Sequence, residues 1–540
     1  MIKKKKWLVS VLSAALVLGS VVTGCGTSST QATQGSADKA MKVSFDPGSE
    51  PKTLDPQMSD GVPEANIEMN LFEGLCRLDK NNNPQLAIAS SIDVSPDNLT
   101  YTIKLKDTKF SNGDPLTADD FKASWLHALD PAAASNYAYQ MFYFKNAEKY
   151  NSGKATADQV GIEVKDPHTL VLTLEAPTPY FKSLLAFQTY YPVDQKVVKA
   201  NKNWNTDAKT FVSNGPFMMK SWTHNDTMVL VKNPNYWDTA NVKLSELDYN
   251  LVEDHKSAAT AFDAGQLDGF YDPTPEDITR YKKAGTLKQA PQLGTYFYRF
   301  NVTKAPLKDP RVREALTICL NRQDLIDHVF KGGQTPAFAY IPGGVPDATA
   351  GKDFRTVGGN YITEDIAKAK QLLAEAGYPD GKNFPTLTLL YNTNGTHQLP
   401  AQAIQDFWHK NLGINIKLLG QEWQVYLQTQ QNLQYDISRA GWLGDYIDPM
   451  TFMDMFTTGN GENQTGWSNA QYDKDIQTAK NTADQTVRMK AMHDAESILM
   501  KEMPIMPIYF YVNNYVLKDN IKGVIVNPQG DFDFKTAYIQ

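Results

Sequence analysis

Strand-like and helix-like patterns alternate along this chain for far more residues than one hydrophobic core can hold. The sequence has 540 residues, so two or three domains are expected. Hydrophobic residues make up 41% and charged residues 21%, which is typical of a globular protein. No internal repeat is visible. The patterns predict a mixed fold, α/β or α+β, with several sheets.

Local signals predict individual elements in the first two thirds of the chain. Residues 99–105 and 169–174 alternate polar and apolar side chains, as half-buried strands do. Thr117, with Asp120 three residues later, is placed to cap a helix. Asp309, followed by proline, is placed to begin another.

The region after residue 360 predicts a βαβ-like unit. Residues 366–376 form a helix that Gly377 ends. Residues 384–391 and 415–419 are predicted strands that flank a helix over residues 404–411.

The N-terminus resembles an export signal. Four lysines, residues 3–6, precede an apolar segment over residues 7–22 that is too short and too interrupted to span a bilayer comfortably. Small residues then precede Cys25, as in the lipobox of bacterial lipoproteins. We therefore expect residues 1–24 to be a signal peptide, Cys25 to carry a lipid anchor at the extracytoplasmic face of the cell membrane, and residues 25–40 to be a flexible tether. An ordinary signal peptide with an incidental cysteine is the alternative.

The two other cysteines, Cys76 and Cys319, lie far apart in apolar surroundings. So few cysteines do not make a disulfide scaffold. We expect both to be buried as small hydrophobic side chains, and a disulfide between them is the alternative.

Charge and motifs disfavour several classes of protein. The net charge of −7 becomes −11 once the four lysines of the leader are removed, which argues against nucleic-acid binding. The sequence has no nucleophile elbow, no His-Glu-x-x-His, no Cys-x-x-Cys and no phosphate loop. Asp79 begins a segment like a calcium loop, but Pro84 stands where that loop needs glycine. These observations favour a binding protein with neither metal nor cofactor over an enzyme, although no motif would reveal the carboxylate pair of a glycosidase.

Residues 438–446 place opposite charges a few residues apart. In an extended strand, one face carries Arg439, Gly441, Leu443 and Asp445. At about 3.3 Å per residue the two charges lie roughly 20 Å apart, a span that suits a short extended peptide. Asp445 would meet an ammonium group and Arg439 a carboxylate, while the main chain pairs with the peptide as an added strand. In the alternative, Asp445 caps a turn and Arg439 forms a structural ion pair.

Six segments resemble, in the same order, the peptide-binding lipoproteins of ABC importers. This is the extracellular solute-binding protein family 5, cluster C, which includes oligopeptide, dipeptide and nickel receptors. The segments are residues 50–56, 70–75, 99–125, 214–217, 310–316 and 438–446. The last segment resembles the oligopeptide branch.

The resemblance implies a two-lobed, periplasmic-binding-protein-like (type II) fold with a hinge and an additional domain. The implied division is lobe 1 from residues 41–71, 197–295 and 513–540, the extra domain from residues 72–196, and lobe 2 from residues 296–512.

The resemblance also implies roles for charged residues. Asp445 would bind the amino terminus of a peptide, and Arg439 and His397 would meet the carboxyl terminus of shorter peptides. His397 in a surface loop is the alternative.

Further residues are implied to surround the ligand. Its flanking strands would be Gly441-Trp442-Leu443 and Asp60-Gly61-Val62. Its side-chain pockets would be lined by Trp423 and Trp442, for which a place in the core is the alternative. The aromatic residues near the cleft would be Tyr137, Tyr296, Tyr298, Tyr509 and Tyr511.

The function implied is that of the substrate-binding component of an ABC transporter, which captures short oligopeptides and delivers them to permease and ATPase subunits. We expect a monomer without catalytic activity. The alternatives are a receptor for a dipeptide, murein peptide, oligosaccharide or nickel complex, a sensor of signalling peptides, and a surface hydrolase.

Overall fold

The computed structural model describes residues 41–59, 61–80, 82–393 and 397–540. The predicted signal peptide, Cys25, the tether and Asp60 lie outside the described residues. Among the residues described, no helix is long and apolar enough to cross a membrane.

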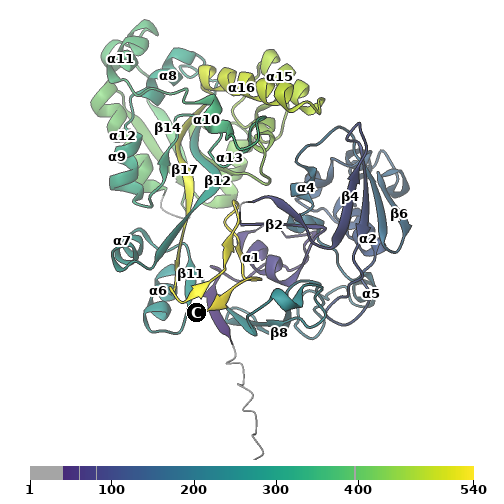
Figure 1. Cartoon of the computed structure of the whole chain (residues 1–540). Coiled ribbons are helices and arrows are strands. Elements are labelled where there is room, and N and C mark those ends of the chain that lie inside the picture. Colours follow the sequence, from purple (N-terminus) through teal and green to yellow (C-terminus); the bar gives the residue numbers. More distant parts are fainter. Residues whose placement is uncertain (1–40, 60, 81, 394–396) are drawn as a thin grey trace, which may run out of the picture. The chain divides into compact units, whose positions relative to one another are not determined.

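One large mixed sheet contains eleven strands (Figure 1). Their order is β15 (Ile416–Gln421), β14 (Leu387–Asn392), β16 (Ile437–Leu443), β12 (Leu287–Phe300), β17 (Ile505–Leu517), β11 (Gly269–Tyr271), β1 (Lys42–Asp46), β10 (Glu246–Asn250), β9 (Thr227–Lys232) and β8 (Phe217–Thr223), with β13 (Thr335–Pro336) paired to β17.

The two longest strands, β12 and β17, are antiparallel neighbours in the middle of this sheet. Their pairing is irregular between Pro291 and Thr295, where the register shifts. The lobe boundaries expected from the sequence, at residues 295/296 and 512/513, fall inside these two strands. The assignment of lobes and extra domain stays a prediction.

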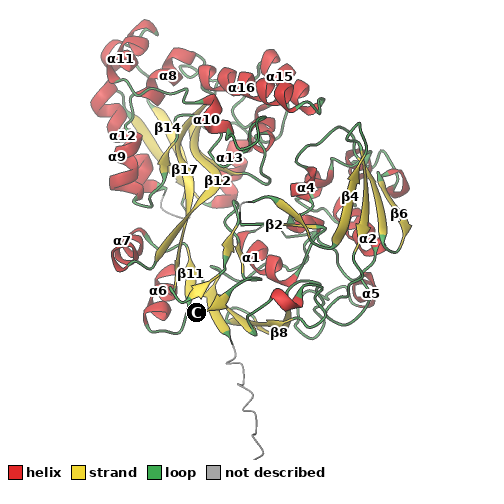
Figure 2. Ribbon diagram, in the orientation of Figure 1, coloured by secondary structure: helices red, strands yellow, loops and turns green. Residues whose placement is uncertain are grey.

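The predicted βαβ-like unit is confirmed. Strands β14 and β15 are parallel, and α12 (Gln398–Leu412) connects them and packs against both (Figure 2). Gly413 ends α12 in the left-handed conformation that glycine adopts without steric cost.

A second sheet confirms the two strands predicted at residues 99–105 and 169–174. It contains β4 (Ala89–Val94), β5 (Thr100–Leu105), β7 (Thr169–Thr173) and β6 (Ile162–Asp166), in that order. Helix α2 (Ala118–Leu129) begins after Thr117, whose backbone N–H donates to the Asp120 carboxylate at 2.9 Å, as predicted. Because the side chain at the third helical position returns to the cap, the first turn is fixed locally.

The other helices are short to medium in length. They are α1 (Val62–Leu71), α3 (Ala147–Asn151), α4 (Phe181–Leu184), α5 (Gln195–Ala200), α6 (His255–Asp263), α7 (Pro275–Ala284), α8 (Pro310–Ile318), α9 (Arg322–Leu325), α10 (Phe354–Gly358), α11 (Ile366–Glu375), α13 (Trp423–Gln431), α14 (Met450–Met453), α15 (Ala470–Lys480) and α16 (Gln485–Glu502). Helices α8 and α11 confirm the two predicted from Asp309 and from residues 366–376.

Three two-stranded ribbons complete the strands of the described residues. They are β2 (Cys76–Leu78) with β3 (Pro84–Leu86), β18 (Ile521–Lys522) with β21 (Tyr538–Ile539), and β19 (Ile525–Val526) with β20 (Phe532–Asp533).

Buried hydrophobic side chains form two main clusters. One combines side chains from residues 75–190 with side chains from residues 293–509, and the other unites residues 43–72 with residues 191–251 and 517–537. Cys76 and Cys319 are both buried and both free, so the disulfide considered from the sequence is wrong and the small-hydrophobe interpretation is confirmed.

Candidate functional site

Among the described residues, no strand covers one edge of β16 beyond its first two residues. Strand β12 covers the other edge along the whole of β16, whereas β14 pairs only with Ile437 and Ser438. The N–H of Gly444 donates to Leu293, so the even-numbered residues of β16 direct their peptide groups toward β12. The odd-numbered residues, Gly441 and Leu443 among them, therefore direct theirs toward the open edge.

Arg439 lies at the start of this open edge, with its guanidinium among aromatic side chains. It stacks over the Tyr296 ring at 4.8 Å from the ring centre and donates to the Tyr511 hydroxyl and to the Asn392 amide oxygen, both at 3.4 Å. The Arg439 carbonyl accepts hydrogen bonds from Tyr426 and Gln430. Within the described part of the chain, no carboxylate forms an ion pair with Arg439, although its Nε is buried without a hydrogen-bond partner.

Two glycines make room for the side chain of Tyr511, which extends from β17 across β12 to β16. A Cβ at Gly294 would lie 2.9 Å from the Tyr511 ring, and a Cβ at Gly441 would lie 2.5 Å from its hydroxyl oxygen. Gly441 therefore permits a close approach that any side chain would block.

His397 lies next to the same aromatic group. Its Nδ1 is 3.3 Å from the Tyr296 hydroxyl. Burial, together with the neighbouring Arg439 cation, lowers the pKa of His397 to about 3. The imidazole is thus neutral at ordinary pH, and it can offer a ligand a hydrogen bond but no positive charge.

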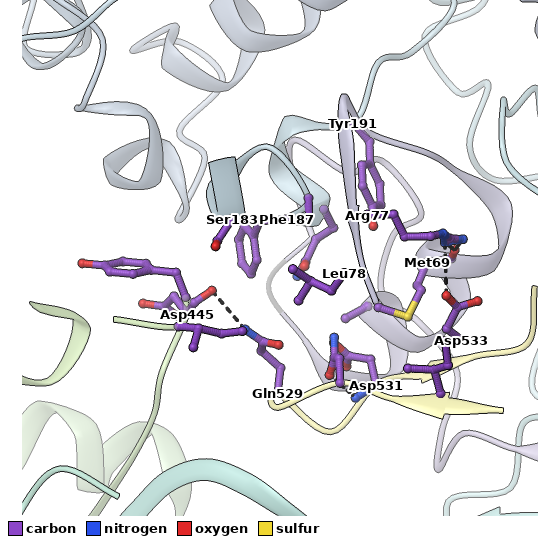
Figure 3. A pocket seen from close by; sticks show the side chains of 17 residues that line it. Met69, Arg77, Leu78, Ser183, Phe187, Tyr191, Asp445, Gln529, Asp531 and Asp533 are labelled. Atoms are coloured by element: carbon purple, nitrogen blue, oxygen red, sulfur yellow. Dashed lines mark hydrogen bonds and ion pairs between the residues drawn. The ribbon is translucent and has the colours of Figure 1, made fainter. Parts of the chain in front are cut away.

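Asp445 lies two residues beyond the end of β16, which corrects the expectation that it belongs to the strand. Its main-chain N–H donates to the Thr451 hydroxyl at 3.1 Å, and its carbonyl accepts from the Gln529 amide at 3.3 Å (Figure 3). The side-chain carboxylate accepts from the Tyr139 hydroxyl at 3.4 Å. No cationic side chain of the described residues pairs with it, and burial raises the pKa of the Asp445 carboxyl to about 7.

Asp445 is one of the residues that line a pocket (Figure 3) with an empty volume of ≈ 640 Å³, including space open to solvent. The pocket is formed by α1, β2, the segment from Ser183 to Tyr191, residues 445–447 and the hairpin that contains β19 and β20. Arg439 and His397 do not line it. The two ends of the predicted site are therefore separate places, joined by the edge of β16.

The remaining predicted residues have varied positions. Tyr137 packs edge-on against Phe187, which lines the pocket, and against the ring of Tyr139. Trp442 is partly buried against the core, and its indole N–H has no hydrogen-bond partner. Leu443 is exposed at the end of β16.

Of the expected flanking strand at residues 60–62, only the assignment of Val62 to a strand is wrong, because Gly61 has extended backbone angles. A place for these residues beside a ligand stays a prediction. Gly61 is the N-cap of helix α1 and Val62 is its first residue, so Val62 belongs to a helix. Asp60 lies outside the described residues, and so does the side chain of Trp423, whose backbone begins α13.

Several site residues were missed by the reasoning from sequence. They are Tyr139, Gln529, Asn392, Tyr426 and Gln430. Tyr139 follows Tyr137 by two residues and could have been considered with it. The others lie between 9 and 84 residues along the chain from the residues that they contact, and they carry no local signal.

Within the described ranges, no group of three or more His, Cys, Asp or Glu side chains is arranged to hold a metal ion. The candidate site consists of the Asp445 carboxylate and the Arg439 guanidinium, neither with an ion-pair partner among the described residues, and of the edge of β16 between them.

Comparison with known proteins identifies the family. Residues 83–464 match the family model described as bacterial extracellular solute-binding proteins, family 5 Middle. The chain belongs to this family. The oligopeptide-binding protein OppA of Bacillus subtilis (strain 168) is 37% identical over 551 residues, covering 99% of this chain and 100% of that protein. The dipeptide-binding protein DppE of the same organism is 37% identical over 543 residues, covering 99% of each.

Solved structures of family members share the fold. The OppA of Haemophilus influenzae in complex with RPPGFSPFR superimposes with a TM-score of 0.76 at 32% identity, covering 93% of this chain and 99% of that one. The peptide-bound OppA of Listeria monocytogenes gives a TM-score of 0.77 at 31% identity, covering 93% and 99%. The two-lobed type II fold and the mixed α/β class predicted from the sequence are confirmed, as is the family. These relatives are binding proteins.

Proposed function

We propose that this chain is the extracytoplasmic substrate-binding component of an ABC importer, and that it captures short oligopeptides in extended form between its lobes. The peptide amino terminus meets Asp445, and the carboxyl terminus of a short peptide meets Arg439. No bond of the peptide is broken, and the captured ligand passes to permease and ATPase subunits in the membrane.

The observation that carries this proposal is a pair of unmatched opposite charges at the two ends of one open strand edge. A buried carboxylate or guanidinium without a counter-ion costs several kcal/mol. Asp445 and Arg439 both lack an ion-pair partner among the described residues. A zwitterionic peptide supplies both counter-ions at once, which a sugar or a bile acid does not.

The strand edge supports recognition that is independent of peptide sequence. Gly441 and Leu443 direct main-chain donors and acceptors toward the open side of β16, where an extended peptide can pair with them as an added strand. Between Arg439 and Leu443 the strand spans about 13 Å, so a peptide of three or four residues reaches from one charge toward the other.

The relatives support peptides as the ligand class. Two of the solved neighbours hold peptides, and relatives named for oligopeptide and dipeptide binding cover nearly the whole chain. The relatives also include a murein peptide-binding protein of Escherichia coli (strain K12) at 35% identity. A free peptide with both termini charged fits the two unmatched side chains best.

The proposal also covers how the protein is anchored and how its parts are arranged. A lipid on Cys25 holds the protein at the outer face of the cell membrane, residues 25–40 act as the tether, and the protein is a monomer.

Strands β12 and β17 act as the hinge between lobe 1 and lobe 2, because both expected boundaries fall within this one pair of strands. The extra domain at residues 72–196 contributes Tyr139 to the amino-terminal end of the site.

Calorimetry with the purified protein tests the function. The protein is first freed of any co-purifying ligand, which is identified by mass spectrometry. We expect peptides in that fraction and one-to-one binding of Ala-Ala-Ala, with the intact peptide recovered afterwards. A non-peptide solute in the fraction together with no response to Ala-Ala-Ala would overturn the proposal, and cleavage of the peptide would overturn its non-catalytic part.

A further inference from the structure

The pocket beside Asp445 has an excess of negative charge. Its lining residues include three aspartates, Asp445, Asp531 and Asp533, and one arginine, Arg77. Arg77 lies 3.5 Å from Asp533 and 3.0 Å from Glu73, so the charge of Asp533 already has a counter-ion. Among the described residues, Asp445 and Asp531 have no such counter-ion.

Asp531 is the second of these. Its side chain is 5% exposed, and one carboxylate oxygen, Oδ2, accepts from the Asn527 amide at 2.9 Å. The other oxygen, Oδ1, accepts no hydrogen bond from the described residues, and no lysine, arginine or histidine among them pairs with Asp531. Burial raises the pKa of the Asp531 carboxyl to about 6.

Gln529 adds an acceptor between the two carboxylates. Its amide nitrogen donates to the Asp445 carbonyl, whereas its amide oxygen is buried without a partner (Figure 3). This side of the pocket therefore presents unmatched acceptors, which call for a ligand group that carries both positive charge and several donors.

The pocket is also lined by apolar side chains. Met69, Leu78, Phe187 and Ile525 line it together with Tyr191. A methylene chain can pack along such a surface while a charged end group reaches the acceptors, which is how lysine and arginine side chains are usually accommodated.

We propose that this pocket is the subsite for the side chain of the ligand's first residue, and that Asp531 makes it selective for lysine or arginine there. The inference rests on the proposed function, because the ammonium group of the peptide must first be held by Asp445. A side chain on the first residue leaves the same carbon as that ammonium group. It therefore enters the pocket that Asp445 borders, and its cationic end neutralises Asp531.

An alternative role for Asp531 is purely structural. Its N–H and that of Gly530 donate to the Asn527 side chain, so residues 527–531 form a hydrogen-bonded turn that the carboxylate helps to close. A structural role predicts that removing the charge lowers stability but changes the affinity for all peptides alike. The subsite predicts a change that depends on the first residue.

Calorimetry with four peptides separates these roles. Lys-Ala-Ala carries the cation at the first position, Ala-Lys-Ala at the second, Met-Ala-Ala offers a similar stem without charge, and Ala-Ala-Ala is the reference. We expect Lys-Ala-Ala to bind about tenfold more tightly than Met-Ala-Ala, as one charge-assisted hydrogen bond predicts. In Asp531→Asn this difference should shrink to about twofold or less, with the affinity for Ala-Ala-Ala unchanged.

Asp519→Asn is the matched control, because it removes one carboxylate from an exposed position that pairs with Lys288. It should keep the full preference for Lys-Ala-Ala. Equal affinities of the unaltered protein for Lys-Ala-Ala and Met-Ala-Ala would overturn the inference without any variant, while leaving peptide binding itself intact. A preference that persists in Asp531→Asn, or that Ala-Lys-Ala shares equally, would overturn it too. Absence of binding by all four peptides would instead overturn the proposed function, and the subsite with it.

Discussion

Gly441 lies so close beneath the hydroxyl of Tyr511 that a Cβ at this position would be 2.5 Å from the hydroxyl oxygen. The same hydroxyl accepts a hydrogen bond from Arg439 at 3.4 Å. A glycine in β16 therefore fixes the position of the guanidinium that is proposed to meet the carboxyl end of the ligand.

Gly441→Ala should weaken binding of Ala-Ala-Ala about tenfold, because the displaced Tyr511 hydroxyl no longer orients Arg439. The free energy of unfolding should change by only about 1 kcal/mol, since the displaced atom is the end of a side chain. Calorimetry and denaturant unfolding measure the two effects. Gly461→Ala is the matched control, because a Cβ there meets nothing within 4 Å. Equal affinity in both variants would show that Gly441 has no part in the site.

Arg439→Gln should remove the discrimination between a free and an amidated carboxyl terminus. The unaltered protein should bind Ala-Ala-Ala at least tenfold more tightly than Ala-Ala-Ala amide, because only the free acid neutralises the guanidinium. In the variant the two ligands should bind within about twofold of each other. This double comparison isolates the charge pair from any general loss of binding. A variant that still prefers the free acid would place the carboxyl terminus elsewhere.

Asp445→Asn should stabilise the ligand-free protein while it abolishes tight binding. Burial raises the pKa of Asp445 to about 7, so ionising this group in the fold costs free energy. A folded carboxyl with a raised pKa holds its proton more tightly than the unfolded chain does, and stability falls as pH rises from about 4 to about 7. At pH 8 the variant should therefore unfold at a higher temperature, with a gain of up to about 4 kcal/mol, because the pKa is raised by about three units. A lower melting temperature would contradict the unpaired state of this carboxylate.

Affinity for Ala-Ala-Ala should be greatest between about pH 7 and 8. Below pH 7 the Asp445 carboxyl must lose a proton before it can pair with the ammonium group, so affinity falls by up to about tenfold per pH unit. Above pH 8 the amino group of the peptide, which has a pKa of about 8, begins to lose its charge. Titrations in two buffers of different ionisation enthalpy should show proton release on binding at pH 6. A constant affinity from pH 5.5 to 7.5 would argue against the role of Asp445.

The elements that depend on local signals were predictable. Thr117 with Asp120 begins α2, and Gly377 follows the end of α11, because a cap needs only neighbouring residues. Strand β16, and the fact that Arg439 and Gly441 lie on one face of it, also follow from the alternation of residues along a short segment.

The environment of the charges was not predictable in the same way. Asp445 leaves the strand where Thr451, six residues on, and Gln529, 84 residues on, hold its main chain, and the second contact joins segments far apart in the sequence. Tyr139, which donates to its carboxylate, lies two residues beyond the expected Tyr137, inside the short helix Ala138–Met141. Asp531 belongs to the last ten residues of the chain, and only the fold brings it to the pocket beside Asp445.

The central claim is that a buried, unpaired carboxylate receives the charged amino end of a peptide, and blocking that end of the ligand tests it most directly. Calorimetry compares Ala-Ala-Ala with N-acetyl-Ala-Ala-Ala at pH 7.5 on the same ligand-free protein. Acetylation removes the positive charge and leaves the rest of the peptide unchanged, so the account predicts a loss of affinity on the order of a hundredfold or more. Affinities that agree within about twofold would contradict it.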